Sequence, residues 1–340
     1  MDHHRRWPAQ QVGKILLNSD KYNSPVIRTR DFPSISFSAA LIAALLLGWH
    51  WRTTGSAKPQ AVFFMLGFVV ICLVYGHLFL SAVRGFFKNS AGSAFQFLIG
   101  FFIFNSALFF LTMLSPLGIF YNVVLLAVGA VAALLALPRG SSPLTPTGAD
   151  LPACMAIVVS GIAATLWCAE AQQGALLTAN SSVFQVWQDA FFHVRQISSF
   201  AHAEGYRTIQ DISQSGFPAQ IYHYGSYISA AAAMMLTGAS ALDTYTAVQL
   251  PLGIFLVGLA AFSLATHCWG AWAGLAATVA IMLVPDAYQQ GFGNRYLSYN
   301  FISQINLGML YGIACISLAW IFTLEGCRRG ELRLVGLGYL

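Results

Sequence analysis

The segment Val186–Arg195 (Val-Trp-Gln-Asp-Ala-Phe-Phe-His-Val-Arg) places an acid, a histidine and an arginine in one short run. Asp189 and His193 are four residues apart, so on a helix their side chains stand one turn apart on one face. A carboxylate that is partly withdrawn from water can take a proton from an attacking hydroxyl. The spacing therefore predicts a general base at Asp189, with His193 orienting it, sharing a divalent metal with it or donating to a phosphate.

Other polar side chains add candidates for binding. Arg195 and Arg207 suit a leaving phosphate, because guanidinium groups pair well with phosphate oxygens. His223 stands between two tyrosines, which fits an interfacial anchor as well as a phosphate contact. A later polar stretch supplies Arg295 for phosphate, and Asp286 as a metal ligand beside Asp189 and His193. Solvated loops without chemistry are the competing interpretation of both groups.

The composition indicates what surrounds these residues. Of 340 residues, 57% are hydrophobic and 9% are charged, and the mean hydropathy is +0.65, which excludes a soluble globular protein. About 20 apolar residues cross a bilayer as a helix. The sequence predicts an all-α transmembrane bundle of 8–9 spans. The expected spans are Ser34–Gly48, Ala61–Val83, Phe95–Leu114, Leu117–Leu137, Ala153–Ala169, Tyr222–Leu236, Tyr245–Ala265, Trp269–Val284 and Phe301–Leu324.

The loop between the fifth and sixth expected spans has its own periodicity. Over Val186–Ala203 the pattern predicts an amphipathic helix that lies along the membrane surface. The expected apolar face is Trp187, Ala190, Phe191, Val194, Ile197 and Ala201. The expected polar face is Gln188, Asp189, His193, Arg195, Gln196 and Ser199.

The chain divides by composition into four parts. Residues 1–33 form a basic cytoplasmic tail, and residues 34–137 an N-terminal membrane block of four helices. Residues 138–152, rich in Pro, Gly, Ser and Thr, form a linker. Residues 153–340 form a second membrane block with a large outer loop at 170–221. Its last residues resemble the start of a further apolar segment, so we expect this block to be truncated.

Lys and Arg counts predict the orientation. Through residue 225 the side of the tail holds nine and the opposite side four, so we expect a cytoplasmic N-terminus and an outward loop at 170–221. If Trp269–Val284 does not fully cross, Arg328, Arg329 and Arg333 join the cytoplasmic side, and we prefer that arrangement. The net charge of +5 comes mostly from the tail and does not indicate nucleic-acid binding. The expected location is the plasma (inner) membrane of the cell envelope.

Several features, in their order along the chain, resemble the GT-C superfamily of polytopic glycosyltransferases. An outward loop with an acid and an amphipathic helix follows a membrane helix. An aromatic re-entry at Tyr222–Gly225 then leads into a small-residue helix ending in Leu-Thr-Gly-Ala-Ser (Leu236–Ser240). The resemblance covers about residues 153–324. It implies that Asp189 stands where these enzymes have their catalytic acid, and that Pro285–Arg295 matches a later loop that helps bind the donor phosphate or a metal.

The resemblance also implies a reaction. An acceptor hydroxyl, deprotonated by Asp189, attacks the anomeric carbon of a polyprenyl-phosphate-linked sugar at the outer face, and the phosphate leaves with help from an arginine or a metal. The partners are then the bilayer and the lipid-linked sugar, and no nucleotide cofactor is required. Two other classes stay open. A transporter or lipid flippase would use an intramembrane cavity and helices broken near the midplane, and a non-catalytic membrane subunit would need no acid.

Overall fold

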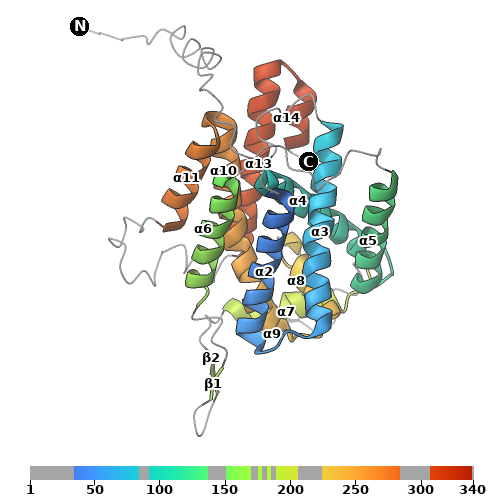
Figure 1. Cartoon of the computed structure of the whole chain (residues 1–340). Coiled ribbons are helices and arrows are strands. Elements are labelled where there is room, and N and C mark those ends of the chain that lie inside the picture. Colours follow the sequence, from blue (N-terminus) through green and yellow to red (C-terminus); the bar gives the residue numbers. More distant parts are fainter. Residues whose placement is uncertain are drawn as a thin grey trace, which may run out of the picture.

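The computed structural model describes residues 34–83, 92–136, 151–169, 175–177, 182–184, 189–205, 224–283 and 307–338. These residues are all-α apart from one antiparallel two-stranded hairpin, β1 (Ala175–Leu177) and β2 (Ser182–Phe184), in which Leu176 lies opposite Val183 (Figure 1). The first five helices are α2 (Ser34–Thr54), α3 (Pro59–Ala82), α4 (Ser93–Leu114), α5 (Ile119–Ala136) and α6 (Leu151–Trp167). The others are α7 (Asp189–Ala201), the 3-10 turn η4 (Tyr224–Ser226), α8 (Ile228–Thr237), α9 (Ala241–Thr244), the π-helical turn η5 (Tyr245–Gln249), α10 (Leu250–Trp269), α11 (Ala271–Leu283), α13 (Leu307–Arg329) and α14 (Leu332–Gly338).

Among the residues that the structure describes, five helices are long and apolar enough to cross a membrane, so the chain is a polytopic helical membrane protein. They are Pro59–Ala82, Ser93–Leu114, Ile119–Ala136, Ala241–Trp269 and Gly308–Arg329. The structure therefore supports fewer spans than the 8–9 expected from sequence. The other expected spans are the 21-residue α2, which ends in the polar run His50–Thr54, and the shorter α6, α8 and α11, with 17, 10 and 13 residues.

Contacts between helix ends define two ends of the bundle. Ser93 Oγ donates to Ser38 Oγ at 2.9 Å, and Ser38 Oγ lies 3.5 Å from Cys154 Sγ, so α2, α4 and α6 begin at one end. Trp49 Nε1 donates to Thr165 Oγ1 at 2.8 Å, so α2 and α6 also finish together. We call the end where α2 begins the tail end and the opposite one the loop end. Figure 1 shows α7 and α9 at the loop end and α14 at the tail end.

The last helices return to the tail end. Trp49, near the end of α2, packs edge-on against Phe255, near the start of α10, with ring centroids 5.9 Å apart. The helix α10 therefore runs opposite to α2. His267 near the end of α10 contacts Glu325 near the end of α13, with Nε2 and Oε2 3.4 Å apart. Both helices thus finish at the tail end, and α14 packs back on α13 beside them, with Gly338 against Ala319.

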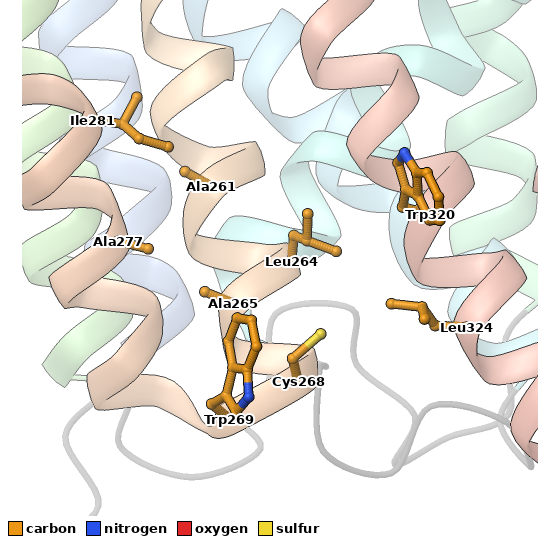
Figure 2. A pocket seen from close by; sticks show the side chains of 9 residues that line it. All are labelled: Ala261, Leu264, Ala265, Cys268, Trp269, Ala277, Ile281, Trp320 and Leu324. Atoms are coloured by element: carbon orange, nitrogen blue, oxygen red, sulfur yellow. The ribbon is translucent and has the colours of Figure 1, made fainter. Parts of the chain in front are cut away.

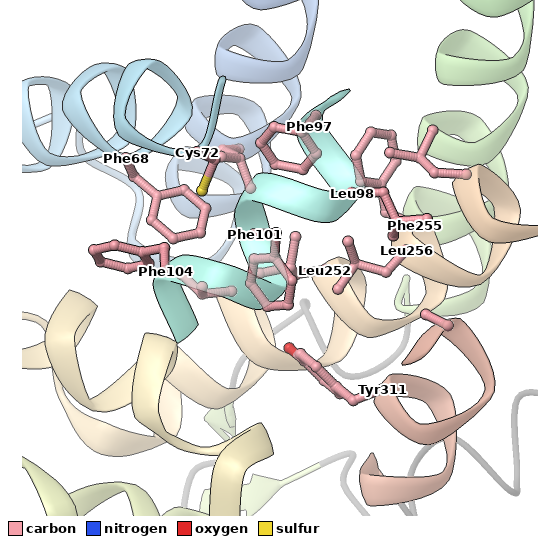
Figure 3. Close-up of a cluster of buried hydrophobic side chains, with 14 of the residues drawn as sticks. Phe68, Cys72, Phe97, Leu98, Phe101, Phe104, Leu252, Phe255, Leu256 and Tyr311 are labelled. Carbon is pink, nitrogen blue, oxygen red and sulfur yellow. The ribbon is translucent and has the colours of Figure 1, made fainter. Parts of the chain in front are cut away.

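One buried core joins the helices before and after residues 138–152. Phe101 and Phe104 of α4 are buried against Phe68 of α3, so these aromatic rings hold the two helices together (Figure 3). Phe97 of α4 meets Phe255 of α10 with centroids 6.3 Å apart. The backbones of α3 and α4 are in direct contact at Gly76 and Gly100. Glycine allows this contact because it has no side chain to keep the two helices apart.

The amphipathic helix predicted over Val186–Ala203 is present as α7, but its predicted faces were partly wrong. Its buried residues are Ala190, His193, Ile197, Phe200 and Ala201. Phe191, expected on the apolar face, is 46% exposed, and His193, expected on the polar face, is 1% exposed. Two features explain why the buried face of α7 differs from the predicted apolar face. Phe200 adds to the buried stripe, and the polar edge of His193 finds a hydrogen-bond partner inside the bundle, which offsets the cost of burial.

Candidate functional site

The expected span Tyr222–Leu236 is not one regular α-helix in its described part, because a 3-10 turn precedes a short α-helix; we call this turn the break. Its described part is the 3-10 turn η4, followed by α8 with only ten residues, which is about 15 Å and half a bilayer. Gly238, with φ 69°, ends α8 in the left-handed conformation that favours glycine. The turn lies against Asn105, the thirteenth residue of the 22-residue α4. The chain therefore has a 3-10 turn, and not regular α-helix, at mid-length of α4.

Two side-chain amides satisfy the backbone at this break. Asn105 Nδ2 donates to the Gly225 carbonyl at 2.6 Å, and Gln249 Nε2 donates to the Ser226 carbonyl at 3.1 Å. Ser229, in the first turn of α8, donates through Oγ to Asn105 Oδ1. Irregular backbone at membrane depth needs such internal partners, because the hydrocarbon region offers none. Both amides are buried, and they hold the break on α4 from one side and on η5 from the other.

The helix that supplies Gln249 is itself irregular. Its segment Tyr245–Gln249 is π-helical and precedes Pro251, which has no backbone N–H to donate. Tyr311 of α13 donates its hydroxyl to the Gln249 carbonyl at 2.9 Å. Gln249 Oε1 is buried and has no hydrogen-bond partner among the residues that the structure describes. It is an acceptor available to a small polar ligand or a water molecule.

His193 lies between two tyrosine rings beside the break. Its Nδ1 is 2.8 Å from the hydroxyl of Tyr227, the residue immediately before α8. Its ring stacks on Tyr227 with centroids 5.8 Å apart, and on Tyr245 with centroids 5.9 Å apart and planes only 9° apart. Both tyrosines are buried. This arrangement fixes the imidazole plane and assigns Nδ1 to Tyr227, so a contact to a substrate or a carboxylate has to come from Nε2.

Only part of the predicted site can be located. Asp189 is the first residue of α7, and its side chain is outside the described part of the chain. Arg195 is half-buried on α7. Arg207, His223, Arg295 and the metal candidate Asp286 lie outside the described residues. Among the residues that the structure does describe, no three His, Cys, Asp or Glu side chains lie close enough together to bind one metal ion.

The residues that hold the break were not among the functional candidates predicted from the sequence. Asn105 and Gln249 are amides inside apolar runs that were read as ordinary spans, and polar residues within membrane helices usually carry a function or a specific contact. That rarity was the available signal. No comparable signal marked Tyr227 and Tyr245, since tyrosines are common near membrane surfaces.

No protein-family model, curated protein or solved structure matches this chain.

Proposed function

We propose that this protein is an integral membrane glycosyltransferase that moves a sugar from a polyprenyl-phosphate donor to an acceptor hydroxyl at the loop end. The observation that carries the proposal is the burial of His193 between Tyr227 and Tyr245, on a helix that begins at Asp189. Helical spacing then sets Asp189 one turn before a histidine whose ring is held in place. A rigid partner of this kind can orient a general base, which is what hydroxyl activation requires.

The role of His193 follows from its hydrogen bond. If the Tyr227 hydroxyl donates to Nδ1, then Nε2 carries a proton and can donate to Asp189 or to the leaving phosphate. If Nδ1 donates to Tyr227, then Nε2 is an acceptor and a metal ligand. The proposed phosphate contacts are Arg195 of α7 together with Arg207, His223 and Arg295. Asp286 joins Asp189 and His193 as a proposed metal ligand.

Helix directions support an outer location for this site. Twelve of the 17 Lys and Arg of the chain belong to segments that precede or follow a helix end at the tail end. They are the six of residues 1–33, Arg84, Lys88, Arg139, Arg328 and Arg329 at the end of α13, and Arg333 of α14. The positive-inside rule then makes the tail end cytoplasmic and the loop end the outer face. Because α10 and α13 both finish at the tail end, Arg328 and Arg329 at the end of α13 lie on that side.

A transporter is the second candidate function, and the break itself favours it. Transporters bind substrates at discontinuous helices near the bilayer midplane. At the start of α8, the buried Gln249 Oε1 is the acceptor that such a site would use, beside the amide of Asn105. The two functions depend on different residues, since transfer needs the acid on α7 and transport needs the polar break.

The decisive experiment measures sugar transfer by variants of Asp189, His193 and His202 in the same membranes. Asp189→Asn keeps size but cannot take the proton, so transfer of sugar from lipid-linked donor should fall roughly 10²–10⁴-fold in membranes with normal protein level. His202→Ala, on the exposed end of the same segment, is the matched control and should be mild. His193→Phe keeps the stacking and removes the hydrogen bond, and a large loss would assign it a phosphate, metal or carboxylate contact.

Lipid extracts of cells with and without the gene, compared by mass spectrometry, identify the sugar donor for this assay. Near-normal transfer by well-expressed Asp189→Asn would refute the enzymatic proposal. If solute or lipid flux into proteoliposomes is then lost in Gln249→Leu but kept in Asp189→Asn, the transporter is the better description.

A further inference from the structure

An apolar groove runs along the outer face of α10 at the tail end, bordered by α11 and α13. Its volume is about 410 Å³. The lining residues are Ala261, Leu264, Ala265, Cys268, Trp269, Ala277, Ile281, Trp320 and Leu324. In Figure 2, Leu264 and Cys268 of α10 lie across the groove from Trp320 and Leu324 of α13. The groove opens outward, because Trp269 and Trp320 are 77% and 56% exposed.

A charged cluster stands directly beyond this groove on α13. Glu325 is 3% exposed, and its carboxylate accepts a hydrogen bond from Arg329 Nε. Arg328 Nη1 lies 3.6 Å from the same carboxylate, and the side chain of Arg328 is 57% exposed. One carboxylate thus faces two guanidinium groups, with His267 as a third neighbour. The cluster therefore carries excess positive charge, and Arg328 is its more exposed cation, with 57% of its side chain exposed against 33% for Arg329.

The spacing on α13 connects the cluster to the groove. Leu324 lines the groove, and Arg328 is four residues later, one turn further toward the tail end on the same face. Trp269 and Trp272, at the junction of α10 and α11, are both largely exposed at this level. Exposed tryptophans are typical of the boundary between acyl chains and headgroups. The groove consequently lies at acyl-chain depth and Arg328 at headgroup depth.

We propose that this groove binds one acyl chain of an anionic phospholipid from the leaflet at the tail end, with the lipid phosphate against Arg328. The exposed surface of the lining is apolar, which suits an acyl chain better than a polar ligand. A basic group at the mouth of a cleft between membrane helices recognises anionic headgroups. The tail end also carries most Lys and Arg of the chain, which is the side where anionic lipids are attracted.

The test uses the purified full chain in detergent, loaded with phosphatidylglycerol or phosphatidylcholine of identical acyl chains, and native mass spectrometry of the retained lipid. Wild type should retain phosphatidylglycerol about fivefold better than phosphatidylcholine, since one basic contact contributes about 1 kcal/mol near a membrane surface. Arg328→Gln should bring the two lipids to parity. Arg333→Gln, also exposed at the tail end, is the matched control and should keep the preference.

A variant that fills the groove tests the contribution of the acyl chain separately from that of the headgroup. Ala261→Trp should lower retention of both lipids, whereas Ala132→Trp, on the exposed face of α5, should not. Circular dichroism of each variant checks that the helices are intact. Equal retention of the two lipids by wild type would overturn the headgroup contact. Unchanged retention of phosphatidylglycerol by folded Ala261→Trp would overturn the groove as the binding site, and would indicate ordinary lipid around the bundle.

Discussion

Removing the Asn105 side chain should destabilise the protein more than any exposed change on α4. Asn105 holds the break through two hydrogen bonds, one to the Gly225 carbonyl and one from Ser229 Oγ. Hydrogen bonds between membrane helices contribute about 0.6 kcal/mol on average and up to about 1.7. The Gly225 carbonyl, left without this donor at membrane depth, adds about 1–2 kcal/mol. Asn105→Ala should therefore lower the free energy of unfolding by about 2–3 kcal/mol.

The measurement is unfolding of the purified protein by increasing SDS in mixed micelles, followed by circular dichroism. Ser106→Ala, the exposed neighbour on α4, should change the free energy of unfolding by less than about 0.5 kcal/mol. Ser229→Ala alone should cost about 1 kcal/mol, because it removes one of the two bonds. The double variant should cost less than the sum of the single ones, because both remove the bond they share.

Two results would refute this reasoning. If Asn105→Ala unfolds at the wild-type SDS fraction, the break is not held by the amide. If the effects of Asn105→Ala and Ser229→Ala simply add, the two side chains do not interact in the folded protein, and the position of η4 against α4 is wrong.

The close packing of α3 on α4 makes a second prediction. Gly100→Ala would press its methyl group into the backbone of Cys72, so it should cost at least about 1–3 kcal/mol in the same SDS titration, whereas Gly67→Ala, with open space around it, should be neutral or slightly stabilising. A tolerated Gly100→Ala would contradict the contact between the two backbones. For topology, single cysteines at Ser181 and Ser141, in a background without native cysteines, should react oppositely with an impermeant thiol reagent in intact cells. Labelling at Ser141 from outside would reverse the proposed orientation.

Much of the local structure was predictable because apolar runs with helical length have few alternatives in a membrane. The cores of α3, α4, α5, α10 and α13 fall within predicted spans. The α7 helix was predictable from its periodicity, and the structure narrows it to Asp189–Ala201. The hairpin of β1 and β2 was not predicted, since three-residue strands are too short to show alternation.

The break at η4 could not be read from the chain, because it depends on partners far away in sequence. The segment Tyr222–Leu236 is apolar enough to be predicted as a span. The amides of Asn105 and Gln249, 120 and 23 residues away from their carbonyl partners, satisfy the backbone of the 3-10 turn at that depth. The burial of the His193 side chain likewise depends on a partner far away in the sequence. On a helical wheel it belongs with polar residues, and the hydroxyl of Tyr227, 34 residues later, allows it to be buried.

The sequence by itself thus determined that the chain is a polytopic helical membrane protein, where most helices lie, and which short run holds the scarce acid and histidine. Composition and periodicity suffice for that, because each helix satisfies its own backbone whatever its neighbours are. Tertiary structure alone decided which helix is broken, which face of α7 is buried, and that α10 and α13 end together at His267 and Glu325. Those outcomes depend on pairing of polar groups across helices, where the gain of each contact exists only once both partners are in place.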